Sequence, residues 1–271
     1  MSLTLGNLVL NGKCHVMGIL NVTPDSFYDG GLHFDLADTQ KRVDAMVKEG
    51  VEIIDIGGES TRPGSKPVTI KEELERVIPA IKYIAENYDV PISIDTQKAE
   101  VAKEAIEAGA HIVNDVGGLR NEDMISVVSE MNVPVIMMHM QGTPENMQNN
   151  PQYGDVVEDI KEWLEERISA AGKAGIKRSN IIVDPGIGFG KNLKHNLELL
   201  GRLSEFKGMA GGVLLGASRK SFIAMMTGNE KGDRLTGSLS AAIMGVAGGV
   251  DILRVHDVKE TLSAVNAVNN L

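Results

Sequence analysis

Charged side chains follow two short apolar runs in this chain, at the points where the runs end. Asp184 comes directly after residues 181–183 and leads into a glycine-rich stretch that ends at Lys191. Arg254 and His256 follow residues 250–253 in the same way. A short buried strand that ends in a charged residue is how parallel α/β proteins present chemical groups to a ligand. We therefore expect a functional site built from strand ends.

The same kind of ending recurs along the whole chain. In order, the apolar runs deliver Asn21; Asp55 and Glu59 to Arg62; Asp95; Asn114 and Asp115; His139 and Gln141; Asp184; Ser218, Arg219 and Lys220; and Arg254 and His256. Taken singly, each has an ordinary structural explanation, since an Asp after a strand is most often a helix N-cap. Polar endings on every run favour a shared site, because the stability face of a barrel gains nothing from them.

One subset of these residues suits a flat, nitrogen-rich ring. Asp95, Asn114, Asp184 and Lys220 combine carboxylate, amide and ammonium groups. Such acceptors and donors pair with amino, ring N–H and carbonyl groups of a heterocycle such as a pterin or a purine.

A second subset suits a diphosphate. Asn21, Thr61, Arg62, Arg254 and His256 bring cations, a hydroxyl and an amide to the same end of the strands. The charge of a diphosphate can also recruit a hard cation such as Mg²⁺. Together the two subsets predict group transfer with diphosphate as the leaving group.

Other phosphate and metal motifs are not matched. The stretch 186–191 lacks the spacing of a nucleotide-binding P-loop, because Pro185 and Asn192 stand where Gly and a hydroxyl residue are needed. Lys191 also replaces the last glycine of a dinucleotide fingerprint. With one cysteine, the chain has no thiolate metal cluster.

The elements that must position these residues follow a regular alternation. Eight β-like runs are expected at residues 15–20, 51–56, 92–95, 111–114, 133–139, 181–184, 212–216 and 250–254. Helical periodicity separates them, clearest over residues 74–85 and 156–171. Eight strands alternating with helices predict an α/β fold, a (β/α)₈ TIM barrel, as one domain over residues 1–271. A doubly wound open sheet is the alternative, but such sheets usually have about six strands.

Three connecting segments have distinct expectations. Residues 3–13 predict a small N-terminal hairpin around Asn11 and Gly12. Residues 21–35 and 61–71 are long, polar loops that follow strand ends, which makes them candidate lids over the site.

Composition narrows the classes of protein. A net charge of −10 argues against a nucleic-acid partner, which would need a basic face. Neither a secretory signal nor an apolar stretch of membrane-spanning length is visible, so no membrane association is expected. The single cysteine, Cys14, fits a cytoplasmic protein.

Eight motifs in family order resemble those of the dihydropteroate synthase family, which acts in folate biosynthesis. They are residues 17–27 (MGILNVTPDSF), 58–64 (GESTRPG), 93–96 (SIDT), 114–116 (NDV), 138–142 (MHMQG), 184–186 (DPG), 218–221 (SRKS) and 254–257 (RVHD). The resemblance implies a TIM-barrel transferase. It would condense 6-hydroxymethyl-7,8-dihydropterin diphosphate with 4-aminobenzoate, giving 7,8-dihydropteroate and diphosphate. Diphosphate would leave before the arylamine attacks.

The resemblance also implies roles for individual residues. Asp95, Lys220, Arg254 and Asn21 would be catalytic, with Asn21 as the Mg²⁺ contact. The pterin diphosphate would be bound by Asp95, Asn114, Asp184, Lys220, Arg254, His256, Thr61 and Arg62. The 4-aminobenzoate would be bound by Phe27, Thr61, Arg62, Pro63, Phe189, Lys220 and Ser221. The family also implies a homodimer formed through helices near the C-terminal part of the barrel.

Two other functions share part of this pattern. A methyltransferase that passes a methyl group from a tetrahydropterin to a corrinoid protein would use the acidic pterin-binding residues, but it would leave Asn21, Arg62 and His256 unexplained. A barrel that binds a pterin without turnover is the second alternative. Dependence of ligand binding on diphosphate and Mg²⁺ would distinguish them from the transferase.

Overall fold

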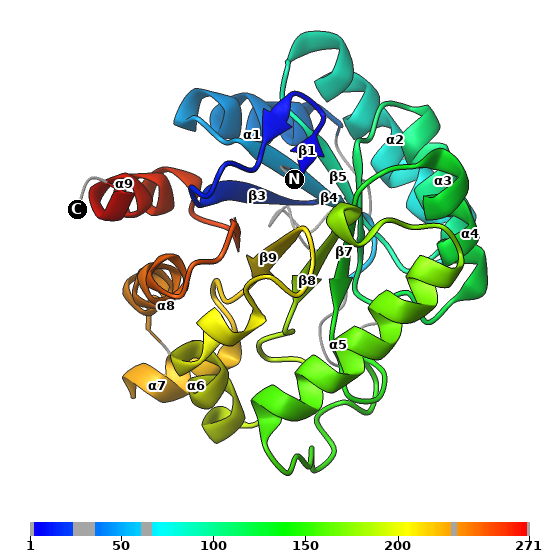
Figure 1. Ribbon diagram of the computed structural model, residues 1–271. Helices are drawn as coiled ribbons and strands as arrows, with labels where there is room; N and C mark the ends of the chain where they lie inside the picture. Colours follow the sequence, from blue (N-terminus) through cyan, green and yellow to red (C-terminus); the bar gives the residue numbers. More distant parts are fainter. Residues whose placement is uncertain (1–2, 24–35, 61–66, 229–231, 270–271) are drawn as a thin grey trace.

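A closed barrel of parallel strands forms the centre of the molecule (Figure 1). The computed structural model describes residues 3–23, 36–60, 67–228 and 232–269. The eight barrel strands are β3 (His15–Asn21), β4 (Ile53–Gly57), β5 (Ile92–Asp95), β6 (Ile112–Asp115), β7 (Val135–Met138), β8 (Ile181–Asp184), β9 (Gly212–Leu215) and β10 (Ile252–Val255). Because β10 pairs with both β9 and β3, the sheet closes, and the expected TIM barrel is confirmed over an open sheet.

Helices surround the barrel and alternate with its strands (Figure 1). They are α1 (Leu36–Glu49), α2 (Ile70–Asn87), α3 (Ala99–Glu107), α4 (Glu122–Met131), α5 (Val156–Lys173), α6 (Leu193–Gly201), α7 (Ser221–Thr227), α8 (Leu235–Ala247) and α9 (Val258–Asn269), with short 3₁₀ turns at Arg178–Asn180 and Leu203–Phe206. Side-chain caps set several starts: the Asn121 side chain accepts a hydrogen bond from the Asp123 amide at the beginning of α4. Among the described residues, no helix is long and apolar enough to cross a membrane.

The barrel interior contains two layers of side chains, one apolar and one polar. Successive residues of a strand face opposite sides, so residues two apart share a face. The lower layer is formed by Met17, Ile53, Ile112, Ile136, Ile182, Leu214 and Ile252, all fully buried. Two residues further along four of these strands stand Asp55, Asn114, Asp184 and Arg254. Polar groups therefore collect at the carboxyl ends of the strands.

An N-terminal hairpin seals the apolar layer from below. Strands β1 (Thr4–Leu5) and β2 (Leu8–Val9) pair antiparallel, and Leu3, Leu5 and Leu10 join the cluster inside the barrel. The hairpin is as expected, but its turn lies at Gly6 and Asn7 rather than at Asn11 and Gly12. Burial of the three leucines decides the register, and the Leu10 amide donates to the Leu3 carbonyl at 2.9 Å.

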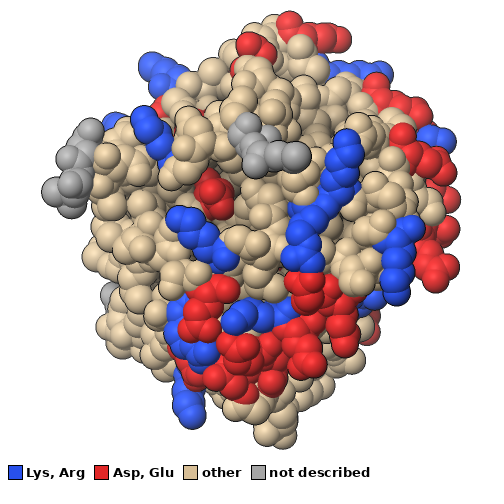
Figure 2. Space-filling view, viewed as in Figure 1, with Lys and Arg blue, Asp and Glu red and all other residues tan. Residues whose placement is uncertain are grey.

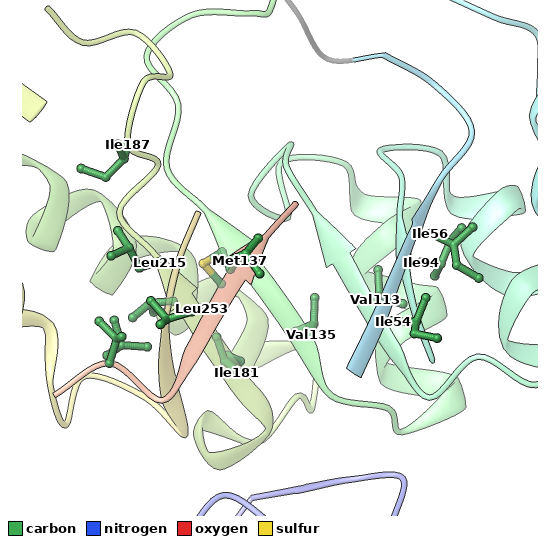
Figure 3. Close-up of a cluster of buried hydrophobic side chains, with 14 of the residues drawn as sticks. Ile54, Ile56, Ile94, Val113, Val135, Met137, Ile181, Ile187, Leu215 and Leu253 are labelled. Atoms are coloured by element: carbon green, nitrogen blue, oxygen red, sulfur yellow. The ribbon is translucent and has the colours of Figure 1, made fainter. Parts of the chain in front are cut away.

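The second face of each strand packs against the helices. Figure 3 shows part of this outer core, including Ile54 and Ile56 of β4, Val135 and Met137 of β7, and Leu253 of β10. Nearly continuous Val, Ile and Leu in these strands is expected for a sheet buried on both faces.

Many charged residues lie on the surface, away from the barrel mouth. Figure 2 shows acidic and basic side chains gathered low on one face, over α5 and α6. Arg202 is central to this group, with carboxylate oxygens of Asp155, Glu198 and Glu205 within 3.2 Å of its guanidinium. Exposed ion pairs of this kind contribute little individually to stability.

Candidate active site

Arg254 joins two buried carboxylates at the carboxyl end of the barrel. Its Nε donates to Asp55 Oδ2 at 2.6 Å, and its Nη2 donates to Asp95 Oδ2 at 2.6 Å. The Asn114 amide donates to the same Asp55 oxygen at 3.1 Å. Strand register brings the group together, because Asp95 of β5 pairs with Gly57 of β4 and Asn114 of β6.

Burial and the charges in this cluster both shift the pKa values of its members. Burial raises the pKa of Asp95 to about 7, although the nearby Arg254 opposes the shift. Burial alone would lower the pKa of the Arg254 guanidinium, but Asp55 and Asp95 outweigh that effect and raise it. Strongly perturbed groups in a shared cluster mark functional-site candidates.

Lys220 and Asp184 lie beside Arg254 at the barrel mouth, since a Cβ at Gly216 would come within 4.0 Å of atoms of all three residues. Gly216 separates them: a Cβ there would lie 3.8 Å from Asp184 Oδ2 and 3.9 Å from Lys220 Nζ. Burial lowers the pKa of Lys220 to about 8, opposed by Asp184, and burial raises the pKa of Asp184. Lys220 therefore offers a hydrogen-bond donor and Asp184 an acceptor on either side of Gly216, which has no side chain to fill the space.

The Lys220 ammonium also contacts the loop after β8. It donates to the carbonyl oxygen of Ile187, and it lies 4.3 Å from the centre of the Phe189 ring. Ser221, the next residue, begins α7 and is exposed. Three of the residues expected to bind the arylamine thus lie close together in sequence or space.

Asn21 lies at the end of β3, next to the Arg254 cluster. A Cβ at Gly57 would lie 3.6 Å from Asn21 Oδ1 and 3.7 Å from Asp95 Oδ2, so both oxygens border the same space. Within the described residues, no group of three or more His, Cys, Asp or Glu side chains could hold a metal ion. Mg²⁺ needs few protein ligands, because it is usually held by one or two oxygens with water and substrate phosphates. Asn21 fits that mode of binding.

His256 follows β10, and Ser218 follows β9. The His256 amide donates to Ser218 Oγ at 3.2 Å, and His256 Nδ1 lies 3.1 Å from the same oxygen. Ser218 therefore orients the imidazole. Four expected site residues, Phe27, Thr61, Arg62 and Pro63, lie outside the described residues.

Two residues at the site were given no binding role from the sequence. Asp55, expected only as one of the polar strand ends, is fully buried in the Arg254 cluster. Its signal was present, because it alternates with Ile53 and so faces the barrel interior. Lys191 is also buried, with 3% of its surface exposed. No signal in the sequence separates it from an ordinary surface lysine.

Comparison with known proteins identifies the family. Residues 17–256 match the family model described as "Pterin binding enzyme". A dihydropteroate synthase of Escherichia coli (strain K12) is 48% identical over 254 residues, which cover 94% of this chain and 90% of the relative.

The chain belongs to the dihydropteroate synthase family. Solved structures agree: Xanthomonas albilineans dihydropteroate synthase with 4-aminobenzoic acid is 41% identical, has a TM-score of 0.90, and covers 97% of this chain and 94% of that one. The same enzyme in complex with 7,8-dihydropteroate is 38% identical, has a TM-score of 0.89, and covers 100% of this chain and 98% of that one. As a member of the dihydropteroate synthase family, the chain is a transferase of the folate pathway.

Proposed function

We propose that the carboxyl end of this barrel condenses 6-hydroxymethyl-7,8-dihydropterin diphosphate with 4-aminobenzoate. The products are 7,8-dihydropteroate and diphosphate. The observation that carries the proposal is the cluster of Arg254, Asp55, Asp95 and Asn114 at the barrel mouth, with Asp184 and Lys220 beside it. Solved relatives with 4-aminobenzoic acid and with 7,8-dihydropteroate support the choice of substrates and product.

The pterin ring binds among these polar groups at the barrel mouth. Asp95 and Asp184 accept hydrogen bonds from its amino and ring N–H groups, while Asn114 and Lys220 donate to its acceptors. The buried position of the acidic groups strengthens these hydrogen bonds, because the local dielectric is low.

The diphosphate binds beside Arg254 and His256, with Thr61 and Arg62 as further contacts. Asn21 would hold Mg²⁺, and the bound ion would supply positive charge beside the leaving diphosphate. Arg254 supplies a fixed positive charge at the same place, since Asp55 and Asp95 hold its guanidinium.

Catalysis proceeds by departure of diphosphate followed by attack of the arylamine. The bond between the pterin methylene carbon and the diphosphate oxygen breaks, and its electron pair leaves with diphosphate. The cationic methylene is stabilised by the pterin ring and by Asp95. The 4-aminobenzoate nitrogen then forms the new C–N bond and loses a proton to solvent or diphosphate.

The arylamine binds against Phe189, Lys220 and Ser221, with Phe27, Thr61, Arg62 and Pro63 completing its site. We expect ordered binding, with pterin diphosphate first. The candidate lids at residues 21–35 and 61–71 would close over the bound diphosphate and so complete the arylamine site. Binding of 4-aminobenzoate measured by calorimetry should require diphosphate and Mg²⁺. Equal affinity in their absence would contradict ordered binding.

A homodimer is supported by an apolar face on neighbouring helices. Leu197 of α6, Met225 of α7, and Ile243 and Met244 of α8 are large apolar residues with at least 42% of their surface exposed. Exposed apolar residues that gather on adjacent elements mark interaction sites. We place the dimer interface there.

The whole chain, residues 1–271, acts as one domain in this proposal, and its location is cytoplasmic. The buried free thiol of Cys14 supports a reducing compartment. Cell fractionation with an antibody to the native protein tests the location.

The reaction itself is tested with purified protein, pterin diphosphate, 4-aminobenzoate and Mg²⁺. We expect dihydropteroate by mass spectrometry, equimolar diphosphate, and loss of both on chelation of Mg²⁺. Asp95→Ala and Lys220→Ala should remain folded and lose turnover. Tight pterin binding without product would overturn the transferase in favour of a non-catalytic pterin protein.

A further inference from the structure

Lys191 is buried at the end of the loop that carries Phe189. Its Nζ donates to the Phe189 carbonyl oxygen at 2.9 Å and lies 3.0 Å from Nδ1 of His139. Burial lowers the pKa of the Lys191 amine well below its ordinary value. Burying an amine is costly, and a methionine would fill the same volume without that cost. The amine is therefore best explained by the two polar contacts that it makes.

Four successive backbone carbonyls in the loop between β8 and α6 accept hydrogen bonds from side chains. Ile187, Gly188, Phe189 and Gly190 accept hydrogen bonds from the side chains of Lys220, Gln148, Lys191 and Tyr153, in that order. The loop also lies against the end of β7: a Cβ at Gly186, where φ is +69°, would lie 1.9 Å from the His139 carbonyl oxygen. Only glycine fits that position. The loop thus has one defined course.

The Phe189 ring is confined on two sides. It packs against the buried cluster of Val116, Met138, Met140 and Met147. The Lys220 ammonium lies 4.3 Å from the ring centre, within the range of a cation–π contact. A shift of the Phe189 backbone would therefore move the ring relative to Lys220.

His139 anchors the other side of the Lys191 amine. Burial lowers the pKa of His139 to about 2, so its ring is neutral and Nδ1 can accept a hydrogen bond. The ring packs edge-on against Trp163, with the ring centres 5.0 Å apart. Because His139 sits directly after β7, Lys191 ties the loop to the rigid barrel.

We propose that Lys191 is a positioning residue for the arylamine site, acting through the Phe189 carbonyl and anchored by His139. This inference rests on the proposed function, in which Phe189 and Lys220 bind 4-aminobenzoate. Lys191 touches neither substrate in this arrangement. Its effect is on the binding of 4-aminobenzoate rather than on the binding of pterin diphosphate.

The first experiment is steady-state kinetics of the full chain with Lys191→Met. We expect the KM for 4-aminobenzoate to rise about tenfold or more, with the KM for pterin diphosphate changed by less than about twofold. Lys194→Met is the matched control, because Lys194 is exposed three residues further along and should leave both constants unchanged. Equal increases in the two KM values would overturn the proposal.

A double-mutant cycle tests whether Lys191 acts through Phe189. If it does, Lys191→Met should add little to the KM increase caused by Phe189→Ala, because the ring that it positions is gone. Independent, multiplicative effects of the two substitutions would reject that route.

A second pair of variants keeps the proposal testable if Lys191→Met does not fold. His139→Leu removes the acceptor for Lys191, whereas His139→Asn keeps an acceptor near the position of Nδ1. We expect the KM for 4-aminobenzoate to rise with Leu and to be largely restored with Asn; the same increase in both would contradict the proposal. A wild-type enzyme without turnover would overturn the proposed function and this inference together. An active wild type in which Lys191→Met raises both KM values equally would overturn the inference alone.

Discussion

Arg254 and the two carboxylates that it contacts determine the electrostatics of the barrel mouth at the scale of single residues. A buried carboxylate is costly unless it is paired, and the guanidinium can serve Asp55 and Asp95 at once because its donors form a fixed fork. The pairing holds Arg254 in place before any ligand arrives. Preorganised charge of this kind is most effective toward charge that develops during the reaction.

Arg254→Met should therefore reduce turnover strongly. We expect kcat/KM to fall by about 10²–10³, since the variant loses a cation at the diphosphate and leaves Asp55 and Asp95 without their shared partner. Arg202→Met is the control, because Arg202 pairs with surface carboxylates away from the barrel mouth. A variant with near-wild-type kcat/KM would show that Arg254 does not serve the reaction.

Asp95 should also leave a signature in the pH dependence of stability. Its pKa in the folded chain is raised to about 7 from the ordinary value of 3.8, so the protonated form is favoured by folding. The resulting stabilisation is present below pH ~4 and is lost as the pH rises through ~7. The free energy of unfolding of the wild type minus that of Asp95→Asn should therefore fall by ~1 kcal/mol per pH unit between these limits. Urea unfolding at several pH values measures it; a difference that is flat or rises with pH would contradict the shift.

At the scale of the element, side-chain caps define the start of several helices that follow strand ends. In α4 the Asn121 side chain caps the helix, and Glu122 and Asp123 place negative charge in its first turn. Such charges are favourable at a helix N-terminus because the peptide dipoles leave it partially positive. Caps of this kind, also present at Thr69, Asp155 and Asn192, fix where several loops of the barrel mouth end.

Asn121→Ala should lower the free energy of unfolding by about 1 kcal/mol, because the Asp123 amide loses its acceptor. Asn121→Asp keeps an acceptor and should stay within about 0.5 kcal/mol of the wild type. Chemical denaturation of both variants provides the measurement. Turnover should be unaffected in either, and equal destabilisation by Ala and Asp would argue against the cap.

At the scale of the whole molecule, the barrel keeps its two ends chemically distinct. The hairpin closes the lower end with Leu3, Leu5 and Leu10, while the polar groups face the upper end. Parallel strands make this possible, because all of their carboxyl ends point the same way. Stability and chemistry are thereby assigned to opposite ends of one core.

The exposed apolar face on α6, α7 and α8 predicts association of two copies. Light scattering on a sizing column should give about twice the chain mass of 29.1 kDa for the wild type. Met225→Glu, which places a charge in that face, should shift the mass toward one chain. Val9→Glu is the control, since Val9 is exposed on the hairpin, away from these helices. A monomeric wild type would contradict the dimer.

The sequence by itself determined the barrel and most of the polar residues at its mouth. Strand periodicity and charged strand ends are local signals, so Asp95, Asn114, Asp184, Lys220 and Arg254 could be assigned to one site before any contact was known. Their detailed roles remain proposals, as do those of the residues outside the described ranges.

Only the tertiary structure decided which of these groups touch. Arg254 meets Asp55 across 199 residues of sequence, and that pairing depends on barrel closure, which no local pattern encodes. The hairpin turn lies at Gly6 and Asn7 rather than at Asn11 and Gly12, because the leucines of the hairpin are buried at the lower end of the barrel. Lys191 is buried because the loop folds back on β7. In each case the deciding contacts are made with residues distant in sequence.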